Sequence, residues 1–258
     1  MGHCFSCCNG VTDSEANGSY PLTNTSESGA ANSENKAKPQ QKKMGNLLSV
    51  EQQRLDTASK TGVFALQDQN NISFPMDTLK ITGLRMLHIE NCGLGAVPPD
   101  ISKLAPSLRK LKLPRNKLPN LPDAARELAA LELLDLSHNV ISQLPSALFA
   151  GMARLKEANL SHNRLAILPA SISACAQLKL LDLSYNALTA LPAEVGLLAA
   201  LEDLDISHNQ LSDIGEGFGP GLKRLKRLAA THNQLCGLPA GLLTSSPVEV
   251  IRIEGNPL

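Results

Sequence analysis

A short pattern recurs along most of this chain and limits what it can fold into. Its clearest copy spans residues 131–145 and reads L-E-L-L-D-L-S-H-N-V-I-S-Q-L-P. Apolar residues stand at set offsets from one polar position, which is Asn139 in this copy. The equivalents of this position follow one another at intervals of 23 or 24 residues, and they are Cys92, Asn116, Asn139, Asn163, Asn186, Asn209, Asn233 and Asn256. So regular a period predicts a stack of similar coils.

The physical reason for stacking is that one copy of the pattern cannot bury its own leucines. In a strand the period of two sends Leu134 and Leu136 inward and Asp135 outward. The full pattern, L-x-x-L-x-L-x-x-N/C-x-L, resembles the leucine-rich repeat. This resemblance implies an α/β solenoid with a curved parallel sheet on its concave face and short helical or irregular segments on its convex face.

The polar position of each copy follows the strand, where backbone N–H and C=O groups lack ladder partners. An Asn amide can donate to and accept from such groups inside a coil. We therefore interpret the seven Asn residues and Cys92 as structural. Pairs such as Leu144-Pro145 mark the entry to the convex side, where the missing N–H of proline is tolerated.

Three segments are predicted along the chain. Residues 1–43 are rich in Ser, Asn, Gly and Glu and lack periodicity, which predicts a disordered tail. A capping helix is predicted within residues 44–62, with Ser49-Val50-Glu51-Gln52 as a capping box and Gly62 as its stop. Residues 63–258 are predicted to form a solenoid of about eight to nine repeats, beginning with an imperfect copy that contains Phe64.

The repeat pattern is irregular at two places, and each predicts a local feature of the structure. Glycines surround Phe218 in the sixth repeat, where the other copies have Leu-Pro, and this predicts a looser convex side. The chain ends at Leu258 directly after the last repeat, so we expect an open apolar edge there. Truncation would explain that edge; the alternative is that a partner or a second copy covers it.

The first residues fit a lipidation motif. Met1-Gly2-His3-Cys4-Phe5-Ser6 matches M-G-x-x-x-[ST], which predicts myristoylation of Gly2, and Cys4, Cys7 and Cys8 lie where palmitoylation would follow. One myristoyl chain holds a protein only marginally on a bilayer, so palmitate would be the second signal. We expect the cytoplasmic face of a membrane, most simply the plasma membrane, with a cytoplasmic pool as the alternative.

A second initiation-like string occurs further along the chain. Residues 44–49, M-G-N-L-L-S, fit the same motif and would be acylated only if translation began at Met44. Which of the two starts is used stays open.

The remaining sequence favours a reducing compartment. No stretch approaches the length of a membrane span, and the N-terminus has no apolar h-region. Three cysteines stand at the tail and three are scattered. Extracellular repeat proteins instead carry clustered cysteines at the solenoid ends, so we expect a cytosolic protein.

The N-terminal part of the solenoid shows a more specific resemblance. The run D-T-A-S-K-T-G-V-F-A-L, residues 56–66, is preceded by Met44-Gly45-Asn46 and followed by Phe74-Pro75. It resembles the start of the leucine-rich-repeat-containing protein 57 group, a small intracellular family, over residues 44–258. The resemblance implies a compact cytosolic solenoid with an acylatable start. The 43 extra residues and the abrupt end depart from that pattern.

Candidate binding residues lie in columns across the concave face. One column reads His88, Lys112, Asp135, Asn159, Asp182, Asp205, Ala229 and Arg252, so its centre is acidic and its ends are basic. Lys110 and Arg227 strengthen the two basic ends. Such a patterned groove is suited to a protein partner, and the alternative is a solvated face without a ligand.

A second column contains His138, His162, Tyr185, His208 and His232. We include it in the predicted partner-binding surface, where protonation of its histidines below about pH 6.5 would make binding sensitive to acid. No carboxylate or cysteine completes a metal site around these residues, so no metal is predicted.

Composition and the missing motifs limit the function. A formal charge of +0 and an aromatic content of 3% argue against nucleic-acid binding. There is no phosphate-cradling glycine loop, nucleophile elbow or zinc-ligand spacing, so neither an enzyme nor a cofactor is predicted.

The expected function is a non-catalytic scaffold or adaptor at a membrane that binds a protein on its concave face. The alternative is a soluble cytosolic regulator of a small GTPase or a protein phosphatase. An extracellular receptor would need a leader and capping disulfides. The identity of the partner and the oligomeric state stay open.

Overall fold

The computed structural model describes residues 38–215, 218–245 and 247–258. Most of the tail predicted over residues 1–43, and with it Gly2, Cys4, Cys7 and Cys8, lies outside the described residues. The chain divides into two units, Met1–Met44 and Gly45–Leu258. The solenoid belongs to the second unit.

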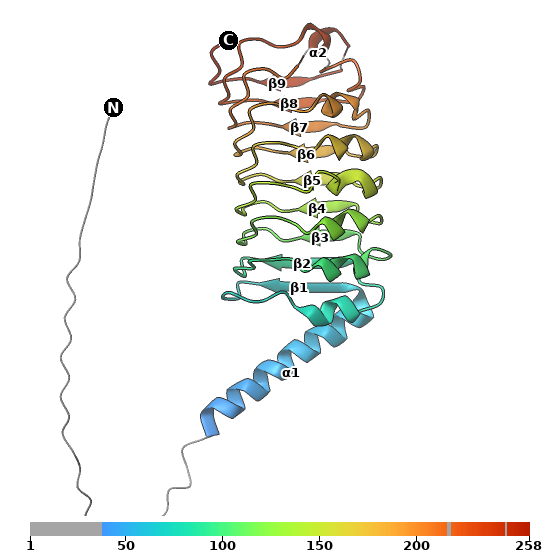
Figure 1. Ribbon diagram of the computed structural model, residues 1–258, viewed down its shortest axis with the longest axis vertical. Helices are drawn as coiled ribbons and strands as arrows, with labels where there is room; N and C mark the ends of the chain where they lie inside the picture. Colours follow the sequence, from blue (N-terminus) through green and yellow to red (C-terminus); the bar gives the residue numbers. More distant parts are fainter. Residues whose placement is uncertain (1–37, 216–217, 246) are drawn as a thin grey trace, which may run out of the picture. The chain divides into compact units, whose positions relative to one another are not determined.

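A parallel sheet forms one side of the solenoid, and within the described residues it has nine strands in sequence order (Figure 1). Successive strands pair residues 23 or 24 positions apart, as in Leu111 with Leu134 and Leu134 with Ala158. The predicted leucine-rich-repeat solenoid is thereby confirmed, and its imperfect first copy supplies β1. The strands are β1 Val63–Gln67, β2 Met86–Glu90, β3 Lys110–Lys112, β4 Leu133–Asp135, β5 Glu157–Asn159, β6 Leu180–Asp182, β7 Asp203–Asp205, β8 Arg227–Ala229 and β9 Val250–Arg252.

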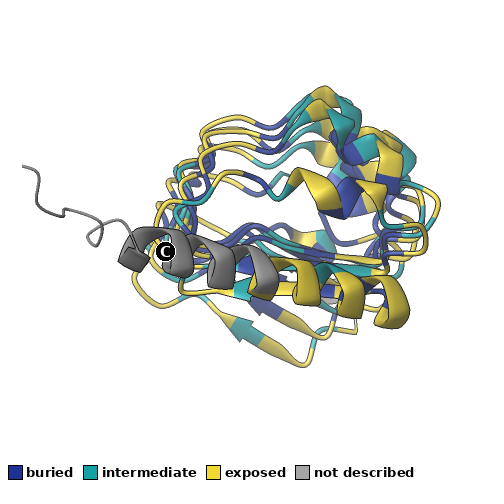
Figure 2. Ribbon diagram, turned by 90° about the horizontal axis from the view of Figure 1, so that it is seen from below, coloured by how far each residue is buried: buried dark blue, intermediate teal, exposed yellow. Residues whose placement is uncertain are grey.

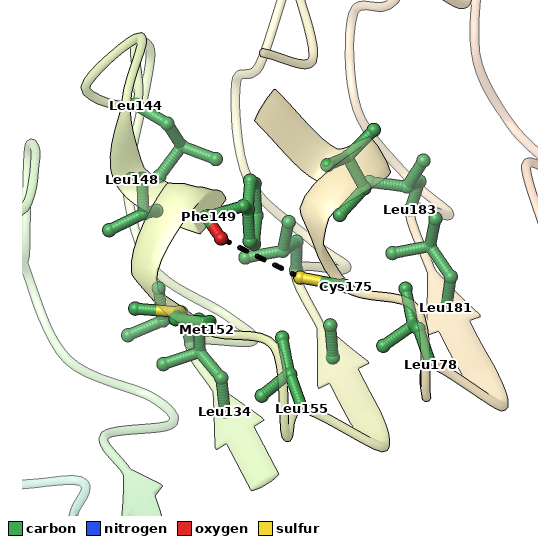
Figure 3. Packing of buried hydrophobic residues seen from close by; sticks show 14 of the residues in the cluster. Leu134, Leu144, Leu148, Phe149, Met152, Leu155, Cys175, Leu178, Leu181 and Leu183 are labelled. Atoms are coloured by element: carbon green, nitrogen blue, oxygen red, sulfur yellow. Dashed lines mark hydrogen bonds between the residues drawn. The ribbon is translucent and has the colours of Figure 1, made fainter. Parts of the chain in front are cut away.

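The core is a column of leucines that continues from coil to coil. Leu134 and Leu136 are fully buried, whereas Asp135 between them is partly exposed. Figure 3 shows Leu134 with Met152 and Leu155 inside neighbouring coils. Burying one such side chain stabilises the fold by about 1.5–3 kcal/mol. The coils therefore hold together through apolar burial that no single coil achieves alone.

Short helices form the opposite side, which we call the helical side. Proline precedes or begins several of them in extended backbone, for example Pro122 and Pro192, because it fixes φ and lacks the N–H that a strand would need. The helices are η1 Met76–Lys80, η2 Pro99–Leu104, η3 Asp123–Glu127, η4 Leu148–Gly151, η5 Ala170–Ala174, η6 Ala193–Leu197 and the α-helix α2 Ala240–Ser245.

The glycine-rich sixth repeat differs from its prediction. Two of its residues, 216 and 217, are not described, and residues 218–221 form turns. These turns are closely packed rather than loose: a Cβ on Gly219 would lie 2.5 Å from a backbone atom of Gly241, and one on Gly221 would overlap the carbonyl oxygen of Gly196. Phe218 is buried beside them. The absence of side chains therefore serves the close approach of neighbouring coils here.

The N-terminal helix α1 spans Lys38–Thr61 and begins before the predicted segment 44–62. It continues through Ser49–Gln52, so the predicted capping box lies inside the helix and does not start it. Pro39 stands in its first turn, where a fixed φ favours helix entry. Among the described residues, no helix is long and apolar enough to cross a membrane.

The last turns of α1 pack on the first coil, at the end of the solenoid seen in Figure 2. Ala58 is fully buried and Leu55 is partly buried against the core. The helix ends where Gly62 adopts a φ of 72°. Arg85 then donates a hydrogen bond to the Thr61 carbonyl oxygen at 3.0 Å.

Candidate functional site

The outward positions of the strands form the exposed face of the sheet, called the sheet face below. The strand register aligns the predicted column from His88 to Arg252 position by position. The register also aligns the residues two positions earlier on each strand, which include the predicted residues Lys110 and Arg227. We call this set the preceding column. The members of this column are Met86, Lys110, Leu133, Glu157, Leu180, Asp203, Arg227 and Val250.

Several of these side chains are not among the predicted binding residues. Glu157 and Asp203 add carboxylates to the acidic centre, and Leu180 and Val250 expose 37% and 41% of their surface. The sequence carries a signal for them, because a strand points residues i and i+2 to the same face. Each residue two positions before a member of the column from His88 to Arg252 therefore belongs to the sheet face.

Three aspartates of the sheet face, Asp135, Asp182 and Asp205, also stabilise the turn that follows their strands. Asp135 Oδ1 accepts hydrogen bonds from the backbone N of Ser137 at 3.1 Å and from its Oγ at 2.7 Å. Asn159 and Asp182 make the same two contacts with the serine two residues later, and Asp205 makes the backbone contact. One oxygen of Asp135, of Asp182 and of Asp205 is thus held in place, and within the described residues the other accepts no hydrogen bond.

Ion pairs change the charge predicted for one basic end. Arg227 is paired with both carboxylate oxygens of Asp203, and its Nη2 lies 2.7 Å from Oδ2. Asp203 raises the pKa of Arg227 through this hydrogen bond and its charge. Within the described residues Lys110, Lys112 and Arg252 have no ion-pair partner. Arg227 is therefore largely neutralised, and Arg252 carries the positive charge of this end.

Glutamates between the strands hold further cations. Glu202 pairs with Lys226 at 3.2 Å and with Lys179 at 3.4 Å, and their hydrogen bonds lower its pKa. Glu132 pairs with Lys156 at 2.7 Å, which lowers its pKa in the same way. These exposed pairs contribute little stability individually.

The asparagine of each repeat lies inside the coil and satisfies backbone groups of two coils. Asn139 Oδ1 accepts from the Leu118 N–H at 3.0 Å. Its Nδ2 donates to the carbonyl oxygens of Leu113 and Leu136 at 2.9 Å and Ser137 at 3.2 Å. Asn116, Asn163, Asn186, Asn209, Asn233 and Asn256 make equivalent contacts. Cys92 is fully buried at the first such position.

The rings of the second predicted column form a continuous stack. His138, His162, Tyr185, His208 and His232 lie face to face, with centroids 4.1–4.3 Å apart and planes within 11°. All five residues have φ between 52° and 55°. This left-handed backbone is uncommon outside glycine, although His, Asn and Asp adopt it more readily than most residues. Each ring is thus positioned by the turn that follows its strand.

The first ring of the stack, His138, has a lowered pKa. Burial lowers the pKa of His138 below its ordinary value of 6.5, and the charges of His162 and Arg115 lower it further. The part of the chain that the structure describes contains no group of three or more His, Cys, Asp or Glu side chains placed to hold a metal ion.

A hollow of about 450 Å³ lies on the sheet face across β6 to β9. Its floor consists of buried leucines, and its walls combine Asp182, Asp205 and Arg252 with the exposed Leu180 and Val250. Ala229 stands between Asp205 and Arg252 in the same column. Its short side chain leaves the space that a longer residue would fill.

Comparison with known families agrees with this geometry. A leucine rich repeat family model matches residues 82–141, 139–188 and 176–235, which together cover more than half of the chain. The chain belongs to the leucine-rich repeat family.

Relatives within the family match only part of their own length. Human podocan-like protein 1 is 32% identical over 122 residues, which cover 46% of this chain and 23% of that protein. A leucine-rich-repeat protein of Leptospira interrogans superposes with a TM-score of 0.67 and 29% identity, covering 76% of this chain and 55% of the other.

A third relative was solved together with a ligand. It is the ectodomain of the plant membrane receptor kinase GASSHO1/SCHENGEN3 from Arabidopsis thaliana, in complex with CASPARIAN STRIP INTEGRITY FACTOR 2. It superposes with a TM-score of 0.65 and 28% identity over 72% of this chain and 23% of its own. Leucine-rich-repeat proteins generally act in protein–protein interaction and typically serve as non-catalytic scaffolds.

Proposed function

We propose that this leucine-rich-repeat protein is a non-catalytic scaffold that binds a protein partner on the sheet face, the concave face of the family. The observation that carries the proposal is the arrangement of charge on that face. Asp135, Asp182 and Asp205 stand in one register column, and in each of them one oxygen is held by the serine that follows while the other has no hydrogen-bond partner among the described residues. Charges fixed in this way select partners by complementary potential.

The N-terminal motif supports the second part of the proposal, a lipid anchor at the cytoplasmic face of a membrane. Myristate on Gly2 together with palmitate on Cys4, Cys7 or Cys8 would supply the two signals that durable attachment needs. A partner held at the same surface binds at a raised effective concentration, so weak contacts on the sheet face suffice. The resemblance to the leucine-rich-repeat-containing protein 57 group belongs to this proposal, because it implies an acylatable intracellular solenoid.

The sheet face is tested by proximity labelling in cells, with the labelling enzyme fused after Leu258 and the native N-terminus left free. We expect the triple variant Asp135→Asn, Asp182→Asn, Asp205→Asn to lose the partner that the wild type labels. Asn159 already stands in the same column with the same serine contacts, so these changes remove charge and keep the turns. An unchanged set of labelled proteins would contradict the proposed binding face.

A matched control removes the same number of charges from the helical side. Asp123→Asn, Glu127→Gln and Glu194→Gln change residues of η3 and η6, away from the sheet face. This control is expected to label the same partner as the wild type. Loss of the partner in both variants would indicate a general effect of net charge and count against the sheet face.

The anchor is tested by separating membrane and soluble fractions. We expect Gly2→Ala and the triple variant Cys4→Ser, Cys7→Ser, Cys8→Ser to move from the membrane to the soluble fraction. Mass spectrometry of the wild-type N-terminal peptide should show the acyl groups directly. A free N-terminal glycine with free thiols, or unchanged membrane content in both variants, would refute the anchor and leave the binding face untouched.

A further inference from the structure

The hollow on the sheet face combines carboxylates, an arginine and exposed apolar side chains in one place. Ala229 is part of its lining and stands between the longer side chains of Asp205 and Arg252 in the same register column. Its volume of about 450 Å³ lies within the range of sites that hold a ligand group. The repeat pattern requires an outward-facing residue at position 229 but does not require a short one. The small side chain of Ala229 is therefore a local feature of this repeat and not a consequence of the fold.

Charge inside the hollow is unbalanced on one side. Asp182 and Asp205 are register neighbours on β6 and β7, and paired strands lie about 4.8 Å apart. Like charges directly opposite one another are destabilising. Asp203 is paired with Arg227, so neither of them relieves this repulsion. A cationic group placed between Asp182 and Asp205 would relieve the repulsion between their carboxylates.

The apolar lining decides between kinds of cation. Leu180 and Val250 are partly exposed at the edges of the hollow, and buried leucines form its floor. A bare inorganic cation would leave this surface wet. An arginine or lysine side chain covers it, because its apolar stem packs on such surface while its charged head pairs with carboxylates. Arginine fits best, since its planar guanidinium bonds two carboxylates at fixed geometry.

The wall of the hollow that contains Arg252 limits which residue can stand beside the basic residue of the ligand. Arg252 lies across the gap from Asp205 and has no ion-pair partner among the described residues. A ligand that carries only positive charge would meet repulsion there. A segment with an acidic residue next to its basic one would pair with both walls.

We infer that the hollow binds an exposed protein segment in which an arginine, flanked by an apolar and an acidic residue, enters between Asp182 and Asp205. This inference rests on the proposed function, because it states which kind of partner segment the sheet face takes. Specificity would then come from one buried guanidinium, and the rest of the face would steer the approach.

The test uses the full-length protein and a phage-displayed library of random linear dodecapeptides. We expect selection on the wild type to enrich peptides with arginine beside an apolar and an acidic residue. Binding of the enriched peptides should weaken ~10-fold or more in the double variant Asp182→Asn, Asp205→Asn, which corresponds to about 1.4 kcal/mol. Ala229→Phe, which fills the hollow from an outward position, should weaken binding to a similar extent.

The matched control is the double variant Asp123→Asn, Glu194→Gln, which removes the same number of charges from the helical side, outside the hollow. It should change binding by less than about twofold. Circular dichroism confirms that each variant is folded, and the double Asp variant decides the question if Ala229→Phe is not. Selection of no peptide, of peptides without a basic residue, or of peptides that bind the double variant unchanged overturns the inference.

Cell labelling separates this inference from the proposed function. If the triple Asp variant loses the partner while Asp182→Asn, Asp205→Asn and Ala229→Phe retain it, the hollow is not the contact and the sheet face still is. If none of these variants changes the labelled proteins, the proposed binding face fails together with the hollow. Loss of the partner in the hollow variants supports both.

Discussion

At the scale of single residues, the asparagine in each coil connects the repeat pattern to stability. Asn139 is 7% exposed, and its amide bonds one N–H and three carbonyl oxygens from two coils. Among the side chains, only asparagine and glutamine carry a neutral amide that both donates and accepts hydrogen bonds, and the glutamine side chain is longer. The fixed spacing of this residue therefore follows from the backbone groups that every turn leaves without partners.

Replacement of Asn139 by alanine should be costly. We expect Asn139→Ala to lower the free energy of unfolding by about 3 kcal/mol, because buried backbone groups lose their partners. Urea denaturation followed by circular dichroism measures the change. Asn159→Ala is the control, since Asn159 lies on the sheet face and, among the described residues, its side chain hydrogen-bonds only with Ser161. An equal loss in both variants would contradict the structural role of Asn139.

The cysteines of the solenoid should differ in reactivity. Burial raises the pKa of the Cys175 thiol to about 12, and its Sγ points to the carbonyl oxygen of Phe149 (Figure 3). Cys92 is fully buried and Cys236 is exposed. The test uses the variant Cys4→Ser, Cys7→Ser, Cys8→Ser, which keeps only the cysteines of the solenoid. Maleimide near neutral pH should modify Cys236 in the native protein, and Cys92, Cys175 and Cys236 after unfolding in urea. Rapid native modification of Cys175 would show that its coil opens.

At the scale of elements, the turn after each strand places one residue in the left-handed region. Asn91, Arg115 and His138 occupy this position in successive coils, with φ of 50°, 55° and 54°. The same position in the last coil is Gly255, with φ of 77°. The five stacked rings are therefore a consequence of backbone geometry, which repeats one side-chain direction at every coil.

The stack should make the solenoid less stable in acid. The folded pKa of His138 lies below 6.5, so below that pH the unfolded chain binds its proton more readily than the folded one. Stability is retained above pH 6.5 and is lost as the pH falls through the folded pKa. We expect the urea midpoint to fall between about pH 7.5 and pH 5. His138→Asn, which is compatible with the left-handed backbone as Asn91 shows, should reduce that fall. An unchanged pH dependence would argue against His138 as its source.

The sequence predicts some of these elements better than others. The strand register follows directly from the spacing of the leucines, because a shift by one residue would expose the core side chains. The start of α1 was not predictable from a capping box, since Ser49 lies within a longer helix that Pro39 can begin. The two outward columns follow from the period of two, but the pairing of Arg227 with Asp203 depends on side-chain conformation. The hollow was not predictable from any single repeat, because its lining residues, among them Ala229, Asp205 and Arg252, come from several strands.

At the scale of the whole solenoid, contact passes from each coil to the next. Across the described residues, the main contacts between elements join sequential strands or sequential helices. Stability in such an array is a sum of coil terms and of interfaces between neighbours. A fault at one interface should therefore act locally before it acts on the entire solenoid.

Gly221 provides a test of this locality. A Cβ at Gly221 would overlap the Gly196 carbonyl oxygen, so Gly221→Ala should force apart the coils of β6 and β7 and cost about 1–3 kcal/mol. Amide hydrogen exchange should show lost protection in β7 to β9 while β2 to β5 stay protected. Gly237→Ala is the control, because nothing lies within 4 Å of a Cβ there. Uniform loss of protection along the sheet would instead indicate one cooperative unit.

The three-residue strands separate what holds the protein together from what it can recognise. In each of them the central residue faces the core, as Leu204 does in β7, and its two neighbours face outward. A ligand therefore meets only side chains that the leucine stack does not use. Outward residues can be exchanged coil by coil, as amide for carboxylate at Asn159 or methyl for carboxylate at Ala229, without altering the framework. New binding preferences are thus accessible to this architecture through surface changes alone.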